Sequence, residues 1–128
     1  MSVKINRIAE GDKFDLYEII HNGSSLIQDF ISGLDDTARD KVFQRLEFIA
    51  DHGAPRDKRK FRKERDGIFS IKVVEHAVRI LCFYEKNKII ILTHGFFKDF
   101  QGGHRLDRQI DRATRLRGEY QQGKGKEQ

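Results

Sequence analysis

Apolar residues in the second half of the chain fall into three short runs that are rich in β-branched side chains. The runs are roughly Ile68–Val74, Val78–Glu85 and Lys88–His94, and runs of this length and composition predict β-strands. Because only two or three residues separate neighbouring runs, we expect the strands to form an antiparallel meander. An earlier run, Phe14–Ile20, predicts a first strand that would complete a four-stranded sheet.

Two segments between the first strand and the meander have the 3.6-residue period of amphipathic helices. The first follows Ser24, which can act as its N-cap, and breaks at Ser32-Gly33. The second covers about residues 36–52 and stops at Gly53, a typical C-cap. We expect these two helices to form a hairpin that covers the sheet. A third helix, with an apolar stripe, is expected over about residues 104–121.

This order of elements predicts an α+β fold in a single domain of residues 14–121. The domain would contain an N-terminal strand, the helical hairpin, the meander and a C-terminal helix. A chain of 128 residues is long enough for one modest hydrophobic core. Residues 1–13 are mostly polar and could form a loose arm or a short extra strand, and residues 122–128 are expected to be a disordered tail.

The charge of the chain narrows the choice of partners. The formal net charge is +5 and the isoelectric point is near 9.4, which favours a polyanionic partner such as nucleic acid, or an acidic protein. An ordinary soluble basic protein would explain the charge equally well.

The single cysteine, Cys82, lies inside an apolar run, where a buried packing residue is expected rather than a nucleophile. One cysteine cannot form an internal disulfide, and it fits a reducing compartment. The sequence has neither an apolar run long enough to cross a membrane nor the pattern of a signal peptide. We therefore expect a cytoplasmic protein that does not act on membranes.

Basic groups occupy, or directly follow, positions in the predicted strands. These residues are Lys72, Arg79, His94 and Lys98. Side chains alternate between the two faces of a strand, so His94 is expected on the face of Ile90 and Leu92. Cations in strand positions indicate a sheet face that binds an anion. The charge-rich residues 56–66 could be a solvated loop or could grip phosphates beside that face.

Three phrases of the sequence, read in order, resemble one protein family. They are FISGLDDTARDKVFQRLEFIADHG, GIFSIK and VRILCFYEKNKIIILTHGFFKDFQ. Together they resemble the RelE/HigB toxins (RelE/ParE superfamily) of bacterial toxin–antitoxin pairs, in particular the phage-derived branch. The resemblance covers residues 14–121, and its most specific parts are the segment His94–Lys98 and the position of Arg79.

The sequence departs from the family pattern at four strand positions. Phe69 stands where tryptophan is usual, Ser70 where glutamate is usual, Lys72 where arginine is usual and Val78 where tyrosine is usual. Lys72 keeps the positive charge but lacks the two-pronged guanidinium that matches a phosphate group. The departures imply an activity that is weaker or differently tuned.

The resemblance implies an mRNA interferase, an endoribonuclease that cuts mRNA, in many cases on the ribosome, by attack of the RNA's own 2′-OH. No metal or other cofactor would be needed, and a small antitoxin protein would neutralise the toxin. The candidate catalytic residues are Arg79, Lys72, His94 and Lys98. Arg79 and Lys72 would stabilise the phosphorane, and His94, whose ordinary pKa is nearest to working pH, would be the acid or base. Lys98 would also hold a flanking phosphate.

Further basic residues are candidates for binding RNA phosphates. They are Lys60 and Arg62 in the charge-rich segment and Arg105, Arg108 and Arg112 in the last helix. The arginines of the helix could equally bind ribosomal RNA or an acidic antitoxin segment. The oligomeric state is left open.

Two other functions fit the same fold. A ParE-like protein would inhibit DNA gyrase without cutting RNA, although the gathered basic groups favour a ribonuclease. A non-catalytic RNA-binding or regulatory protein would explain the departures at Ser70 and Lys72. Fold alone does not choose between these functions.

Overall fold

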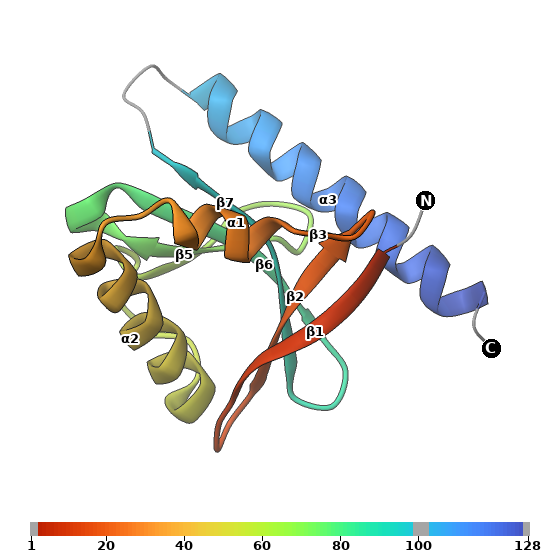
Figure 1. The fold of residues 1–128 in the computed structure, drawn as a ribbon, viewed down its shortest axis with the longest axis horizontal. Coiled ribbons are helices and arrows are strands. Elements are labelled where there is room, and N and C mark those ends of the chain that lie inside the picture. Colours follow the sequence, from red (N-terminus) through yellow and green to blue (C-terminus); the bar gives the residue numbers. More distant parts are fainter. Residues whose placement is uncertain (1–2, 99–102, 127–128) are drawn as a thin grey trace.

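A single mixed sheet forms the centre of the molecule in a computed structural model, which describes residues 3–98 and 103–126 (Figure 1). The strand order is β1-β2-β7-β6-β5-β4, and the short β3 pairs with β2 outside this path. The strands are β1 (Val3–Glu10), β2 (Asp15–His21), β3 (Ser24–Ser25), β4 (Phe61–Lys63), β5 (Phe69–Val73), β6 (Val78–Glu85) and β7 (Ile89–Phe97).

The α+β class and the meander are confirmed, but the predicted four-stranded sheet is wrong. Strands β5, β6 and β7 are consecutive and antiparallel, as their short connections require. Of the two possibilities for residues 1–13, the structure has the strand, because β1 pairs with β2. The strands β3 and β4 were not predicted, since two or three residues are too few to show a period. β2 joins the meander through parallel pairing with β7.

The helices are α1 (Leu26–Ser32), α2 (Asp36–His52) and α3 (Gly103–Lys126), with a short 3₁₀ turn η1 (Val74–His76) after β5. The N-cap of α1 is Ser25 rather than Ser24, and its hydroxyl accepts a hydrogen bond from the backbone N–H of Gln28. Asp35 caps α2 in the same way. The helix ends at Gly53, whose φ of 85° suits glycine.

The last helix continues beyond its predicted end near Gln121. Residues 122–126, expected to belong to a disordered tail, extend α3 to Lys126, while residues 127–128 lie outside the described residues. Glutamine and lysine are good helix formers, and each glycine costs a helix only about 1 kcal/mol. α3 also contacts β1, and this strand was not part of the predicted sheet.

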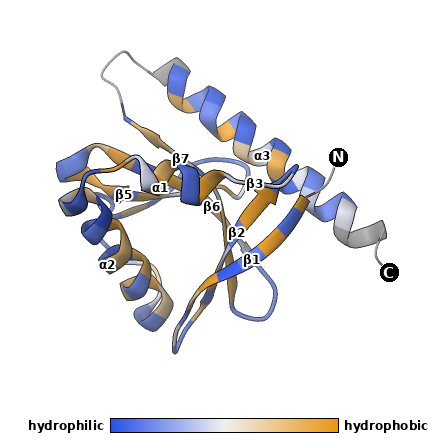
Figure 2. Cartoon of the chain, in the orientation of Figure 1, coloured by the Kyte–Doolittle hydropathy of each residue, from blue (hydrophilic) through white to orange (hydrophobic). Residues whose placement is uncertain are grey.

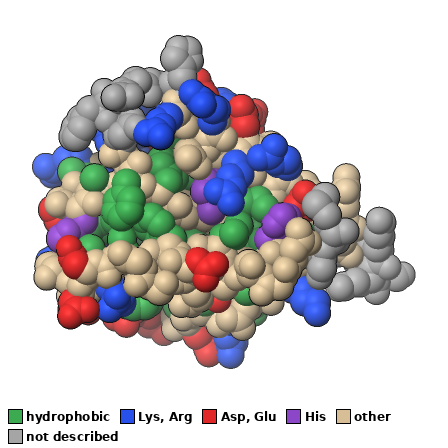
Figure 3. All heavy atoms as spheres, turned by 45° about the horizontal axis from the view of Figure 1, so that its top comes forward, with side chains coloured by type: hydrophobic (Ala, Val, Ile, Leu, Met, Phe, Trp, Pro, Cys, Tyr) green, Lys and Arg blue, Asp and Glu red, His purple; other side chains and the backbone are tan. Residues whose placement is uncertain are grey.

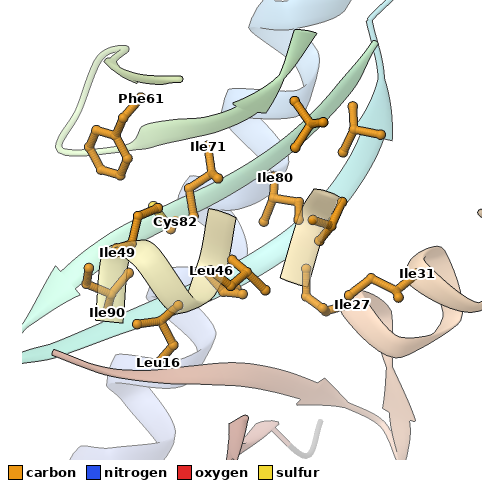
Figure 4. Packing of buried hydrophobic residues seen from close by; sticks show 14 of the residues in the cluster. Leu16, Ile27, Ile31, Leu46, Ile49, Phe61, Ile71, Ile80, Cys82 and Ile90 are labelled. Atoms are coloured by element: carbon orange, nitrogen blue, oxygen red, sulfur yellow. The ribbon is translucent and has the colours of Figure 1, made fainter. Parts of the chain in front are cut away.

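Helices cover both faces of the sheet, and each face has its own hydrophobic core. α1 and α2 lie on one face, where they pack on alternate strand residues such as Ile71, Ile80 and Leu92 (Figures 1 and 4). The opposite face packs against the apolar stripe of α3, through Leu81 and Ile91 among others. The hydropathy of the residues agrees with this packing: the strands are largely apolar, and α3 is polar on its outer side (Figure 2).

A β-bulge in β7 reverses the alternation of side chains just before the candidate site. Leu81 pairs with His94, whereas its neighbour Cys82 pairs with Leu92, so Thr93 is an extra residue in β7. His94 therefore lies on the α3 face, and Leu92 faces α1 and α2. The predicted common face for His94, Ile90 and Leu92 is wrong, because strict alternation cannot anticipate a bulge.

Candidate active site

Cross-strand pairing brings the predicted cations together on the α3 face of the sheet. Lys72 on β5 pairs directly with Arg79 on β6. On the other side of β5, the backbone N–H of Lys72 donates to the carbonyl of Lys60, 2.9 Å away. Because directly paired residues share a face, Lys60, Lys72 and Arg79 form one row across the sheet.

A second row runs beside the first. Arg62 on β4 pairs with Ser70 on β5, Ser70 pairs with Leu81 on β6, and Leu81 pairs with His94 on β7. Five predicted site residues thus lie on neighbouring positions of one sheet face, which runs from β4 to β7: Lys60, Arg62, Lys72, Arg79 and His94.

The basic groups lie near enough to influence one another electrostatically. Burial lowers the pKa of Lys72, and the charges of Arg79, Arg62 and Lys98 lower it further, while Glu64 acts in the opposite direction. Burial also lowers the pKa of Arg79. The negative charge of Glu64 opposes this shift, and the positive charge of Arg62 adds to it. We call Arg62, Lys72, Arg79 and Lys98 the cation cluster.

One donor in the cation cluster has no internal acceptor. The Nη1 atom of Arg79 is buried and has no hydrogen-bond partner among the described residues. Buried donors in folded proteins are nearly always paired, and an unpaired one is costly. A guanidinium can donate two parallel hydrogen bonds to a phosphate or carboxylate. The arrangement of Arg79 is therefore suited to an acceptor that comes from outside the chain.

Glu64 lies next to the cation cluster, and the sequence did not single it out. Its side chain is 8% exposed, its Oε1 accepts a hydrogen bond of 2.8 Å from the Ser70 hydroxyl, and Arg62 Nε lies 4.0 Å from the same oxygen. The backbone N–H of Glu64 donates to the carbonyl of Ile68 and so extends the ladder of β4 and β5. If β4 had been predicted, alternation would have placed Glu64 on the same face as Arg62. A strand of three residues is too short to show alternation in the sequence.

The environment of His94 does not fit the acid–base role predicted for it. Its side chain is 1% exposed, Nε2 lies 2.7 Å from Gln109 Oε1, and Nδ1 lies 3.2 Å from Thr93 Oγ1. Burial lowers its pKa to about 4, the hydrogen bond to Gln109 opposes part of this shift, and the charge of Arg112 lowers the pKa by a smaller amount. The imidazole is thus neutral at pH 7, and its contacts join β7 to α3.

The glycine after His94 has a packing role. A Cβ atom at Gly95 would lie 2.4 Å from Phe30 Cδ2, so that only glycine lets the Phe30 ring lie against β7. Phe30 also packs on Phe97, whose ring centroid is 5.2 Å away. The segment His94–Lys98 thus contacts one helix on each face of the sheet. His94 contacts α3, and Gly95 gives room for Phe30 of α1.

The arginines predicted on the last helix lie on its outer surface, on the same side of the sheet as the cation cluster. Arg105, Arg108 and Arg112 are exposed, and Figure 3 shows basic side chains along α3 above a strip of apolar side chains. Another arginine fixes the helix in place: Arg65, in the turn after β4, contacts Asp107 and Asp111 of α3.

The family comparison matches the part of the chain that forms this site. Residues 29–117 match the family model described as phage derived protein Gp49-like (DUF891), more than half of the chain. The chain belongs to this family. The Gp49-like match includes α2, the strands β4 to β7 and most of α3, and therefore every residue of the cation cluster. It confirms the phage-derived part of the predicted resemblance. No curated protein matches the chain.

Among residues 3–98 and 103–126, no three His, Cys, Asp or Glu side chains come together as a possible metal site. Within the same residues, no helix has the length and hydropathy needed to cross a membrane. Cys82 is fully buried, and burial raises the pKa of its thiol, as a packing residue requires.

Proposed function

We propose that this Gp49-like protein is the toxin of a toxin–antitoxin pair and that it cleaves mRNA at the cation cluster. The observation that carries the proposal is the buried Nη1 atom of Arg79, which has no hydrogen-bond partner in the described part of the chain and lies among three other cations. RNA cleavage by a 2′-OH passes through a phosphorane that carries more negative charge than the ground state. Fixed donors aimed at this charge are the largest single source of catalysis in many enzymes.

The cluster offers two different chemical functions. Arg79 stays charged at any working pH and would bind the non-bridging oxygens of the phosphorane. Lys72 would donate a proton to the departing 5′ oxygen, because burial and its cationic neighbours lower its pKa and make its ammonium group a better acid. Lys60, Arg62 and Lys98 would hold the phosphates on either side of the cut.

The antitoxin would act through the same charges. An acidic segment laid over the cation cluster would satisfy Arg79 and exclude RNA. The exposed arginines of α3 would bind RNA, ribosomal RNA or that segment. His94 enters the proposal as the residue that holds β7 on α3, not as an acid or base.

Primer extension on a defined mRNA in a reconstituted translation reaction tests the proposal. The protein should produce discrete new 5′ ends, and Arg79→Ala should reduce their rate of formation by about 10²- to 10³-fold, the usual cost of removing one transition-state donor. The matched control is Arg7→Ala, since Arg7 is exposed on β1 and pairs with Glu10. Translation without any cuts would overturn the nuclease proposal and favour gyrase inhibition.

RNA binding without cleavage is the second candidate. It is favoured by the neutral, buried state of His94 and by a lysine at position 72. In that case the protein would bind the same mRNA with an affinity that depends on Arg79, and the mRNA would stay intact.

A further inference from the structure

We propose that Glu64 is the general base of this site and takes the proton from the attacking 2′-OH. The inference rests on the proposed ribonuclease function and assigns a role that the cations cannot perform. Activation of a hydroxyl requires a group that accepts a proton within hydrogen-bond reach. Arginine and protonated lysine have no free lone pair, and His94 is sealed between β7 and α3.

The position of Glu64 brings a carboxylate to the cluster without neutralising its key donor. Its charge acts on both Lys72 and Arg79, and its hydrogen-bond partner Ser70 lies on the same face of β5, two residues before Lys72. Nevertheless, Arg79 Nη1 has no acceptor among the described residues. Glu64 is instead held by Ser70, through the hydroxyl bond to Oε1. The site thus keeps a proton acceptor and a phosphate-binding donor separate from each other.

The turn that follows Glu64 is held rigidly, as a catalytic group requires. Arg65 Nη2 donates to Asp111 Oδ1 at 2.8 Å, and Arg117 Nη1 donates to the carbonyl of Asp66 at 2.6 Å. Both contacts tie this turn to α3. Ser70 therefore holds the Glu64 side chain from the sheet, and the contacts with α3 hold the turn that follows it.

Other carboxylates of the basic segment are less suited. Asp57 is bonded by Arg59, which lowers its pKa to about 2 and makes it a weak base. Asp66 pairs with Arg65 on the exposed side of the turn. Neither carboxylate acts on Lys72 in the way that Glu64 does.

The reaction step balances with groups of this site. The carboxylate of Glu64 accepts the 2′-OH proton while the 2′ oxygen forms a bond to phosphorus. The bond from phosphorus to the 5′ oxygen breaks, and this oxygen receives a proton from the Lys72 ammonium. The products are a 2′,3′-cyclic phosphate and a 5′-OH end. Transfer of the proton from Glu64 to Lys72 through water restores both groups.

Glu64→Gln is the first variant to measure, because the amide keeps an oxygen that accepts the Ser70 hydrogen bond but is not basic. Single-turnover cleavage of a defined mRNA should slow by about 10²- to 10⁴-fold, as for other general bases. Binding of an uncleavable 2′-O-methyl RNA should be unchanged or tighter, because a negative charge leaves the cluster. Glu47→Gln, an exposed carboxylate on α2, is the control and should cleave like the wild type.

Ser70→Ala separates the chemical role from a structural one. It removes the hydrogen bond that Glu64→Gln keeps but leaves the carboxylate, so it should slow cleavage at least tenfold less than Glu64→Gln. Equal losses in the two variants, or a Glu64→Gln protein that cleaves at the wild-type rate, would overturn the role of Glu64 and leave the ribonuclease proposal standing. Absence of cleavage by the wild type would overturn the proposed function itself.

Discussion

Arg79 shows how a few neighbours decide what a charged residue can do in a sheet. Its pairing with Lys72 places two cations side by side, an arrangement that destabilises a sheet. The nearby carboxylate of Glu64 is bonded to Ser70 instead of to Arg79. The unfavourable pairing is thus retained in the folded protein, as expected where a site is prepared for an anion.

His94 has a consequence for the pH dependence of stability. Its pKa is about 4 in the folded protein against an ordinary 6.5, so the unfolded chain binds more protons between these values. Stability is fully present above pH 6.5 and is lost as the pH falls towards 4. Between pH 7.5 and pH 5, this single group should lower the free energy of unfolding by about 2 kcal/mol.

Urea denaturation at the two pH values measures this effect, with His94→Gln as the reference. Glutamine does not titrate, so the variant should lose about 2 kcal/mol less than the wild type over the same range. Other titrating groups contribute to both proteins and cancel in the comparison. Equal losses would mean that the His94 pKa is not lowered in the folded state.

At the scale of elements, the contact of α1 with β7 depends on Gly95. Gly95→Ala would force the Phe30 ring away from β7 and should destabilise the fold by about 1–3 kcal/mol, the usual cost of overpacking. Gly118→Ala is the matched control, because its Cβ on α3 would meet nothing within 4 Å. It should stabilise the protein by about 0.5–1 kcal/mol. Thermal unfolding of the two variants checks both signs, and a neutral Gly95→Ala would contradict the packing role.

Elements with a clear period could be predicted, and those set by pairing could not. The 3.6-residue period placed α2 at residues 36–52, where it lies, and short connections gave the meander. The hairpin between β5 and β6 was predicted as well, and Lys72 and Arg79 were both assigned to an anion-binding face, but the register that pairs them was not predicted. By contrast, the face of His94 depends on the bulge at Thr93, and Glu64 joins the site only through pairing of the short β4. Such pairing follows from the folded sheet and leaves no local pattern.

For the whole molecule, the excess of positive charge predicts salt-sensitive RNA binding. Each phosphate contact with a single strand contributes about 0.7 to the slope of log K against log salt concentration. Removing two contacts with the double variant Arg62→Ala/Arg79→Ala should therefore reduce the slope by about 1.4. Titrations of an uncleavable 2′-O-methyl RNA at several salt concentrations measure it, with Arg7→Ala as control. An unchanged slope would place the RNA away from the cation cluster.

The parallel pairing of β2 with β7 affects how the chain reaches this structure. Asp15 pairs with Ile89 and Glu18 with Leu92, so the first hairpin cannot join the sheet before β7 has left the ribosome. Pairing between such distant residues is slow to form, because the intervening chain must first be ordered. His94, which ties β7 to α3 through Gln109, comes later still. A nascent chain therefore lacks a finished site until β7 and α3 have both left the ribosome, long after the hairpin of β1 and β2.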